Sequence, residues 1–345
     1  MRKLITPGRS RLKRWLKRGS LGVVLVIVVA TLTGICYEQI GRRRDARRVP
    51  QVGKSVDIGG RRLNLYCSGE GSPTVIFESG GGAPGYSWVN IQPQVAKFTR
   101  ACWYDRAGYG WSDPGPQPRT SVAIANDLQA LLTVANVAPP YVLVGASFGG
   151  FPVRVFAGRY PTEVAGIVLV DASHEDQHEP DSMKAPVNRL SPAVHNVLCA
   201  LVPTAGQVGL IRLMMKLSGA GPSPAGMTAE QGHVLELLAQ QPKTVASNEG
   251  CHWDDSAAQA RAAGTFGDRP LIVLTAGREF IPPDPQGAKD AKSFHETWVK
   301  ELQPALAHLS TRGRQVVLEN SGHGIQFEAP DAVVEAIREV IKEIQ

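Results

Sequence analysis

The feature that most constrains this chain is an apolar, β-branched run at residues 141–144 that leads directly into Gly-Ala-Ser-Phe-Gly and then into a helical pattern. A strand that turns so sharply into a helix leaves room only for glycine at positions 145 and 149, and it presents Ser147 at the C-terminal edge of a sheet. The backbone N–H of Phe148 then points to where an oxyanion would form. The pentapeptide alone is common, but with its flanking strand and helix it predicts that Ser147 is a nucleophile.

The charge balance argues against a nucleic-acid partner. The chain has 345 residues and a formal net charge of +6. However, residues 1–50 hold 13 lysines and arginines against two acidic residues, a net charge of +11, so residues 51–345 carry about −5. The basic balance therefore belongs to the N-terminal segment, and the remaining chain lacks the positive charge that nucleic-acid binding requires.

The N-terminal segment has the pattern of a membrane anchor. Eight lysines and arginines lie between positions 2 and 18, the next 19 residues, 19–37, are uncharged, and three arginines follow at 42–44. As a helix, the uncharged run would be about 28 Å long, close to the hydrocarbon thickness of a bilayer. We predict one membrane-spanning helix at 21–37, between a basic tail (1–20) and a basic linker (38–53).

Because positive charge is denser before the apolar run, the basic tail is expected in the cytoplasm and the folded domain outside it. The alternative is a cleaved secretory signal followed by secretion. No small-x-small cleavage site follows the apolar run convincingly, which favours the uncleaved anchor. The sequence does not indicate an oligomeric state.

From residue 54 onward, predicted strands alternate with predicted helices, which indicates a mostly parallel sheet covered by helices on both faces. The expected strands are 55–58, 61–67, 74–78, 100–105, 141–144, 166–170, 271–275 and 315–318, and the expected helices are 121–137, 148–160, 291–309 and 331–344. Between 172 and 264 the alternation gives way to helical patterns, which we interpret as a lid inserted into a core of 54–171 and 265–345. Its cluster Leu213-Met214-Met215 is expected to pack inside the lid rather than line an acyl pocket.

A serine hydroxyl is a poor nucleophile near neutral pH, so it needs a base and a third group that orients the base. His323 is the best candidate base, because it follows the last predicted strand in the loop Asn320-Ser-Gly-His-Gly324. Its flanking glycines allow the loop to fold back over the sheet edge. His295 and His308 fall on a predicted helix and are expected at its surface.

These motifs together resemble the α/β-hydrolase superfamily, in its lid-bearing esterase/lipase-like branch, over residues 55–345. Matching segments are Glu-Ser-Gly-Gly-Gly at 78–82, Tyr-Asp-Arg-Ala-Gly-Tyr-Gly-Trp-Ser at 104–112, the serine turn at 145–149 and Gly-His-Gly at 322–324. The resemblance implies an α/β-hydrolase fold: a mostly parallel eight-stranded sheet with helices on both faces and a helical lid after the sixth strand, here behind an N-terminal transmembrane helix. It also implies an oxyanion hole formed by the N–H groups of Phe148 and Gly81, with neighbouring Gly82 left open.

The acid that would orient His323 has two candidates. The superfamily's usual position follows the seventh strand, where Glu279 is the nearest carboxylate but no aspartate stands at the expected offset. Its other position is the end of the sixth strand, where Asp171 follows the buried run 166–170. We favour Asp171, because carboxylates at strand ends point into the site. The pair Asp105-Arg106 is expected to hold its loop and has no predicted catalytic role.

Four of the five cysteines lie in the folded domain. In the superfamily topology the second strand runs antiparallel to the fourth, which implies a disulfide between Cys67 and Cys102 and leaves Cys199 with Cys251. Four free thiols in a reducing compartment are the alternative.

The resemblance predicts a serine hydrolase that cleaves a carboxylic ester or related small-molecule acyl substrate, with no cofactor and no metal. Serine at the turn argues against the dehalogenases and epoxide hydrolases of this superfamily, which use aspartate there. Peptidase, thioesterase, carbon–carbon hydrolase and perhydrolase activities stay open, as does a catalytically silent binding protein.

Overall fold

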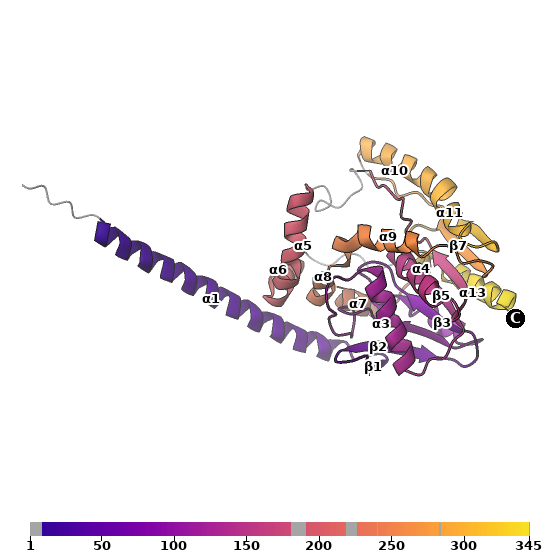
Figure 1. Cartoon of the computed structure of the whole chain (residues 1–345), viewed down its shortest axis with the longest axis horizontal. Coiled ribbons are helices and arrows are strands. Elements are labelled where there is room, and N and C mark those ends of the chain that lie inside the picture. The colour runs from indigo at the N-terminus through magenta and orange to yellow at the C-terminus, as the bar shows by residue number, and fades with distance from the viewer. Residues whose placement is uncertain (1–8, 181–190, 219–225, 240, 283, 345) are drawn as a thin grey trace, which may run out of the picture.

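An eight-stranded sheet lies at the centre of the protein, seen here in a computed structural model that describes residues 9–180, 191–218, 226–239, 241–282 and 284–344 (Figure 1). The strand order is β1-β2-β4-β3-β5-β6-β7-β8. β2 is antiparallel to both β1 and β4, and all other neighbouring strands are parallel. The strands are β1 (Lys54–Asp57), β2 (Arg62–Ser68), β3 (Thr74–Glu78), β4 (Ala101–Tyr104), β5 (Tyr141–Ala146), β6 (Val164–Val170), β7 (Leu271–Ala276) and β8 (Gly313–Leu318). The predicted sheet is confirmed.

Helices bury both faces of this sheet, which is why its central strands are apolar on both sides. Along β5, Leu143 joins one core cluster, whereas Val142 and Val144 join the other, as the two-residue period of a strand requires. One face is covered by α3 (Ser121–Val134), α4 (Gly150–Arg159), α9 (Trp253–Ala262) and α11 (Gln303–Ala307). The other is covered by α2 (Gln92–Val95) and α13 (Pro330–Ile344). Between β7 and β8, α10 (Pro285–Thr297) continues through a π-helix, Trp298–Leu302, into α11.

The N-terminal helix α1 (Arg9–Arg48) is continuous and projects from the folded domain (Figure 1). Its segment Lys17–Arg48 is long and apolar enough to cross a membrane. The helix does not end with the uncharged run, so residues 38–48 of the predicted linker are helical. Glu38 anchors this part of α1 to the domain, because its fully buried carboxylate pairs with Arg212 and Arg42 at 2.8 Å each.

Helices form the described part of the insertion between β6 and β7. They are α5 (Pro192–Gln207), α6 (Leu210–Ser218), α7 (Ala229–Ala239), α8 (Pro242–Ser247), the 3₁₀ turn η4 (Glu249–His252) and α9. The predicted lid boundary at 264 includes α9, yet α9 packs on α3 and α4, where Trp253 contacts Phe148 and Phe151. The expectation that Leu213 and Met214 pack inside the insertion is wrong, since both are exposed.

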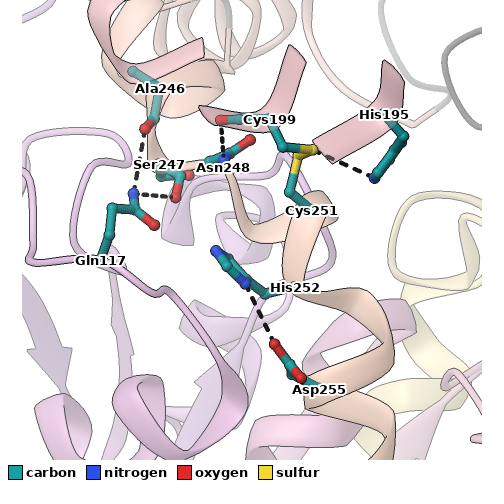
Figure 2. The surroundings of a disulfide bond; sticks show 9 residues. All are labelled: Gln117, His195, Cys199, Ala246, Ser247, Asn248, Cys251, His252 and Asp255. Atoms are coloured by element: carbon teal, nitrogen blue, oxygen red, sulfur yellow. Dashed lines mark hydrogen bonds and ion pairs between the residues drawn. A yellow bond between two sulfur atoms is a disulfide. The ribbon is translucent and has the colours of Figure 1, made fainter. Parts of the chain in front are cut away.

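Two disulfides join the four domain cysteines. Cys67 and Cys102 face each other across the antiparallel pair of β2 and β4, with their Cα atoms 4.1 Å apart. Cys199 and Cys251 tie α5 to η4, with their Cα atoms 5.9 Å apart (Figure 2). Beside this second bridge, the amide of Asn248 donates to the Cys199 carbonyl oxygen at 2.8 Å. Cys36, in α1, is free.

Candidate active site

Ser147 lies where β5 ends and the chain turns into a short 3₁₀ helix, η2 (Ser147–Gly149), before α4. Its φ of +50° is a left-handed conformation that side chains rarely adopt. The turn needs its glycines: a Cβ on Gly145 would lie 2.8 Å from the carbonyl oxygen of Gly149, and a Cβ on Gly149 would lie 2.6 Å from that of Ser79. Strain at this position holds the serine hydroxyl out at the sheet edge.

His323 lies in the loop between β8 and the short helix α12 (Ile325–Glu328), with its imidazole directed at the serine. Its Nε2 atom is 3.0 Å from Ser147 Oγ. Hydrogen bonds to Glu328 hold this loop in place, because its carboxylate accepts from the backbone N–H of Gly322 and from the Arg278 guanidinium. Arg278 also donates to the carbonyl oxygen of Asn320 at 3.0 Å. The position of the imidazole is thus set by a network at the ends of β7 and β8.

Asp171 directly follows β6, and its carboxylate reaches His323. The Oδ2 atom lies 2.6 Å from His323 Nδ1, while Oδ1 accepts hydrogen bonds from the backbone N–H of Ala276 at 2.9 Å and the indole N–H of Trp298 at 2.8 Å. The side chain is almost fully buried, and its φ is +42°. Among the described hydrogen bonds, none joins Glu279 to His323. The structure therefore brings Asp171, rather than Glu279, to the histidine.

The protonation of His323 is controlled by this carboxylate. Desolvation alone would lower the pKa of His323, but the hydrogen bond and the negative charge of Asp171 outweigh it and raise the pKa above its ordinary value. The Nδ1 contact also leaves Nε2 as the nitrogen that faces Ser147. The side chain remains 63% exposed, so solvent and substrate can reach it.

The loop after β3 lies against the serine turn. A Cβ on Gly80 would be 3.3 Å from Ser147 Cβ, and a Cβ on Gly81 would be 3.5 Å from Phe148 Cβ. The backbone of this loop therefore runs beside the start of η2, next to Phe148. Gly82 has a φ of +73°, and a Cβ on it would meet nothing within 4 Å.

A buried ion cluster supports the same loop, and the sequence reasoning missed it. Arg106 donates to the Glu78 carboxylate and to the carbonyl oxygen of Ser79 at 2.6 Å each, and to that of Gly80 at 2.8 Å. Its Nε atom donates to Glu249, in η4 of the helical insertion, at 3.1 Å. Burial raises the pKa of Glu78, although the Arg106 charge opposes the shift. The motif at 104–112 contains Arg106, but the sequence does not show that Arg106 contacts residues 78–80, because the two segments are far apart in the chain. Asp105 has the expected structural role, because it accepts from the N–H groups of Gly85 and Trp111.

A cavity of about 400 Å³ opens beside the three polar side chains. Its walls come from the strand ends, from the insertion and from α10. Aromatic side chains in it are Trp253, Phe280, Phe294 and Trp298. His295 also lines it and contacts the carbonyl oxygen of Gly277 at 3.0 Å, so its predicted place on the helix surface is wrong. The sequence pattern predicted a continuous helix over 291–309, and it did not reveal the π-helix that carries Trp298.

Within the described ranges, one group has the spacing of metal ligands: His195, Cys199 and Cys251. It lies at the bridge in Figure 2, where the two sulfur atoms are bonded to each other. A disulfide sulfur is not the thiolate that metals bind, so this group does not support a metal site in the oxidised protein.

A family model described as the alpha/beta hydrolase fold matches residues 73–330. The chain belongs to the α/β hydrolase superfamily. The uncharacterized protein YqjL of Bacillus subtilis is 31% identical over 278 residues, which cover 80% of this chain and 86% of YqjL. For two other curated relatives the match is partial, and the chain spans 49% of the length of one and 43% of the length of the other.

Solved structures share the fold. A thermophilic esterase from Thermogutta terrifontis has a TM-score of 0.59 and 20% identity, over 85% of this chain and 99% of the esterase. The epoxide hydrolase CorEH has a TM-score of 0.60 and 18% identity, over 85% of this chain and 99% of CorEH. A hydrolase fold is thus established, but the two neighbours differ in their reactions. The reaction has to be argued from the residues of this site.

Proposed function

We propose that this protein is a membrane-anchored serine hydrolase that cleaves a carboxylic ester or related acyl substrate. The observation that carries the proposal is the continuous contact from Ser147 Oγ through His323 to Asp171, at 3.0 Å and 2.6 Å. Nucleophile, base and orienting acid are the three parts that acyl transfer by serine requires. Serine at the turn disfavours the epoxide hydrolase and dehalogenase reactions, which in this superfamily start from an aspartate.

In the proposed mechanism, Ser147 Oγ attacks the substrate carbonyl carbon while His323 Nε2 takes the hydroxyl proton. The negative charge on the carbonyl oxygen is stabilised by the backbone N–H groups of Phe148 and Gly81. His323 then gives its proton to the leaving alcohol, and an acyl-serine forms. Water attacks this ester with His323 again as the base, which releases the acid and restores Ser147. Asp171 holds the imidazole and stabilises its charged form.

The aromatic cavity walls support an apolar acyl or alcohol group as the part of the substrate that binds. The helical insertion, which contributes Trp253 to these walls, is proposed to act as the lid. The helix at 21–37 is proposed to cross the membrane once with the domain outside the cytoplasm. Two disulfides in the domain support that placement, because disulfides persist in oxidising compartments.

Fluorophosphonate labelling of the full-length protein in detergent tests the proposal. We expect labelling of the wild type, none of Ser147→Ala, and unchanged labelling of Ser55→Ala, which replaces an exposed serine on β1. Equal labelling of wild type and Ser147→Ala would contradict the assignment of the nucleophile. A panel of esters, thioesters and peptides with the wild type then decides which acyl bond is cleaved fastest.

A further inference from the structure

Two helices beside α1 leave apolar faces uncovered. The exposed residues follow helical spacing of three and four positions and are between 39% and 78% exposed. On α5 they are Val194, Val197, Leu198 and Leu201, and on α6 they are Leu210, Leu213, Met214 and Leu217. Each helix therefore has a complete apolar stripe that the rest of the domain does not bury, a feature that marks interaction surfaces.

The opposite face of α6 shows that the helix is docked rather than loose. Ile211 is buried, and Arg212 turns inward to pair with Glu38 and Asp45 of α1 at 2.8 Å each. The polar and packing contacts of α6 thus point to the protein, which leaves the leucine stripe on the outer side. This arrangement is the one expected of a helix whose outer side meets an apolar medium.

The junction of α5 and α6 packs closely against α1 at Gly34, which fixes its position along α1. A Cβ on Gly34 would collide with the carbonyl oxygen of Val208, and a Cβ on Gly209 would lie 2.6 Å from the carbonyl oxygen of Gly34. Gly34 belongs to the uncharged run, which ends at Tyr37. At about 1.5 Å per residue, Gly34 lies roughly 5 Å deeper along the helix than the end of that run.

We propose that the exposed faces of α5 and α6 lie in the bilayer leaflet at the C-terminal end of the α1 span. A helix lying in a membrane interface buries its apolar face by about 5–10 Å, which matches the depth of Gly34. α5 and α6 meet at 92°. In Figure 1, α5 runs across the direction of α1, at the edge of the domain nearest the projecting part of α1. α5 can therefore lie along the leaflet that α1 crosses, and the junction at Gly209 keeps α6 beside it.

The leaflet is a better occupant than a second copy of the chain, because α1 already holds these faces at the membrane surface. The proposal depends on α1 spanning the bilayer but not on catalysis.

The Cys199–Cys251 bridge connects this surface to the cavity. It joins α5 to the turn that precedes Trp253, which is a residue of the cavity wall. The membrane-bound helix is thus covalently tied to the candidate active site.

The test measures lipid contact at single positions of the full-length protein in phosphatidylcholine nanodiscs that hold one copy each. In a Cys36→Ser background, an environment-sensitive NBD fluorophore is attached to Leu201→Cys on α5 or Leu213→Cys on α6. Val134→Cys on α3 is the matched control, because Val134 is also an exposed apolar helix residue but lies outside this surface. Val26→Cys, in the uncharged run, reports the anchor. Thermal unfolding checks that each variant is folded.

We expect nitroxide lipids labelled near the headgroup to quench most of the emission at 201 and 213, and none at 134. Lipids labelled deep in the acyl chain should quench position 26. Quenching at 26 with positions 201 and 213 behaving like 134 would overturn the proposal and leave the anchor standing. Blue-shifted emission at 201 and 213 without lipid quenching would also overturn it, since protein would then cover the faces. Absence of quenching at 26 would overturn both the anchor and the proposal.

Discussion

Trp298 donates its indole N–H to the Oδ1 atom of Asp171 at 2.8 Å. The N–H of Ala276 contacts the same oxygen, which leaves Oδ2 for His323. A buried carboxylate that lacked these donors would lose its preferred orientation and would be costly to keep charged. The orientation of the carboxylate toward His323 therefore depends on a tryptophan of the π-helix that follows α10.

Replacing Trp298 by phenylalanine keeps the aromatic ring but removes the donor. A hydrogen bond to a charged group contributes about 1.5–3 kcal/mol, so we expect kcat to fall about tenfold or more, with little change in KM. Ester hydrolysis at saturating and limiting substrate separates the two constants. Trp111→Phe is the matched control, because Trp111 donates to the carbonyl oxygen of Val49, away from the cavity, and kcat should be unchanged. Equal losses in both variants would show that the effect is not specific to Asp171.

The pH dependence of hydrolysis should report His323. Only the neutral imidazole accepts the serine proton, and Asp171 raises the pKa of His323, so activity is lost as the pH falls through that raised value. The acid limb of kcat/KM should have its midpoint above about 6.5, the ordinary value for histidine. A midpoint well below that value would contradict the contact between His323 and Asp171 in the free enzyme.

Asp171→Asn should move this midpoint to lower pH, because the negative charge that stabilises the imidazolium is removed. It should also reduce kcat by about 10⁴-fold, since an amide favours the wrong histidine tautomer. Glu279→Gln is the control for the alternative acid and should leave both the midpoint and kcat unchanged. If Glu279→Gln caused the larger loss, the assignment of the acid would be reversed. Both variants are measured in the same pH series.

Gly149→Ala should damage the site through the backbone. The added methyl group would lie 2.6 Å from the carbonyl oxygen of Ser79 and 2.8 Å from that of Glu78, neither of which can move without displacing the loop after β3. We expect a loss of about 1–3 kcal/mol in the free energy of unfolding and a large drop in fluorophosphonate labelling. Gly250→Ala, where a Cβ meets nothing within 4 Å, should stay within about 0.5 kcal/mol of the wild type.

The cysteines should respond to alkylation in a countable way. The chain has five, and the structure leaves Cys36 free. The denatured, unreduced protein should therefore take up one alkyl group by mass spectrometry, and the reduced protein should take up all five. The Cys199–Cys251 bridge spans 52 positions, so its removal by paired serine substitutions should cost about 4 kcal/mol of unfolding free energy in the chain-entropy model. Cys36→Ser should cost nothing measurable.

The sequence by itself determined the features that depend on neighbouring residues. The apolar runs predicted the strands, because burial on both faces requires them, and the glycines around Ser147 predicted a turn that no larger residue fits. The uncharged run predicted a helix long enough to cross a bilayer. The glycine-flanked loop at His323 was also readable, since it directly follows the last strand.

The tertiary structure alone decided how distant segments meet. It brought Asp171 rather than Glu279 to His323. It also brought Trp298 to Asp171 and Arg106 to the loop after β3. Finally, it docked α6 against α1 through Arg212 and Glu38. The sequence could not resolve these contacts, because each joins residues far apart in the chain and depends on strand order and helix packing. A carboxylate next to the end of a strand looks the same in sequence whether it faces the histidine or the solvent, and only the folded backbone distinguishes the two.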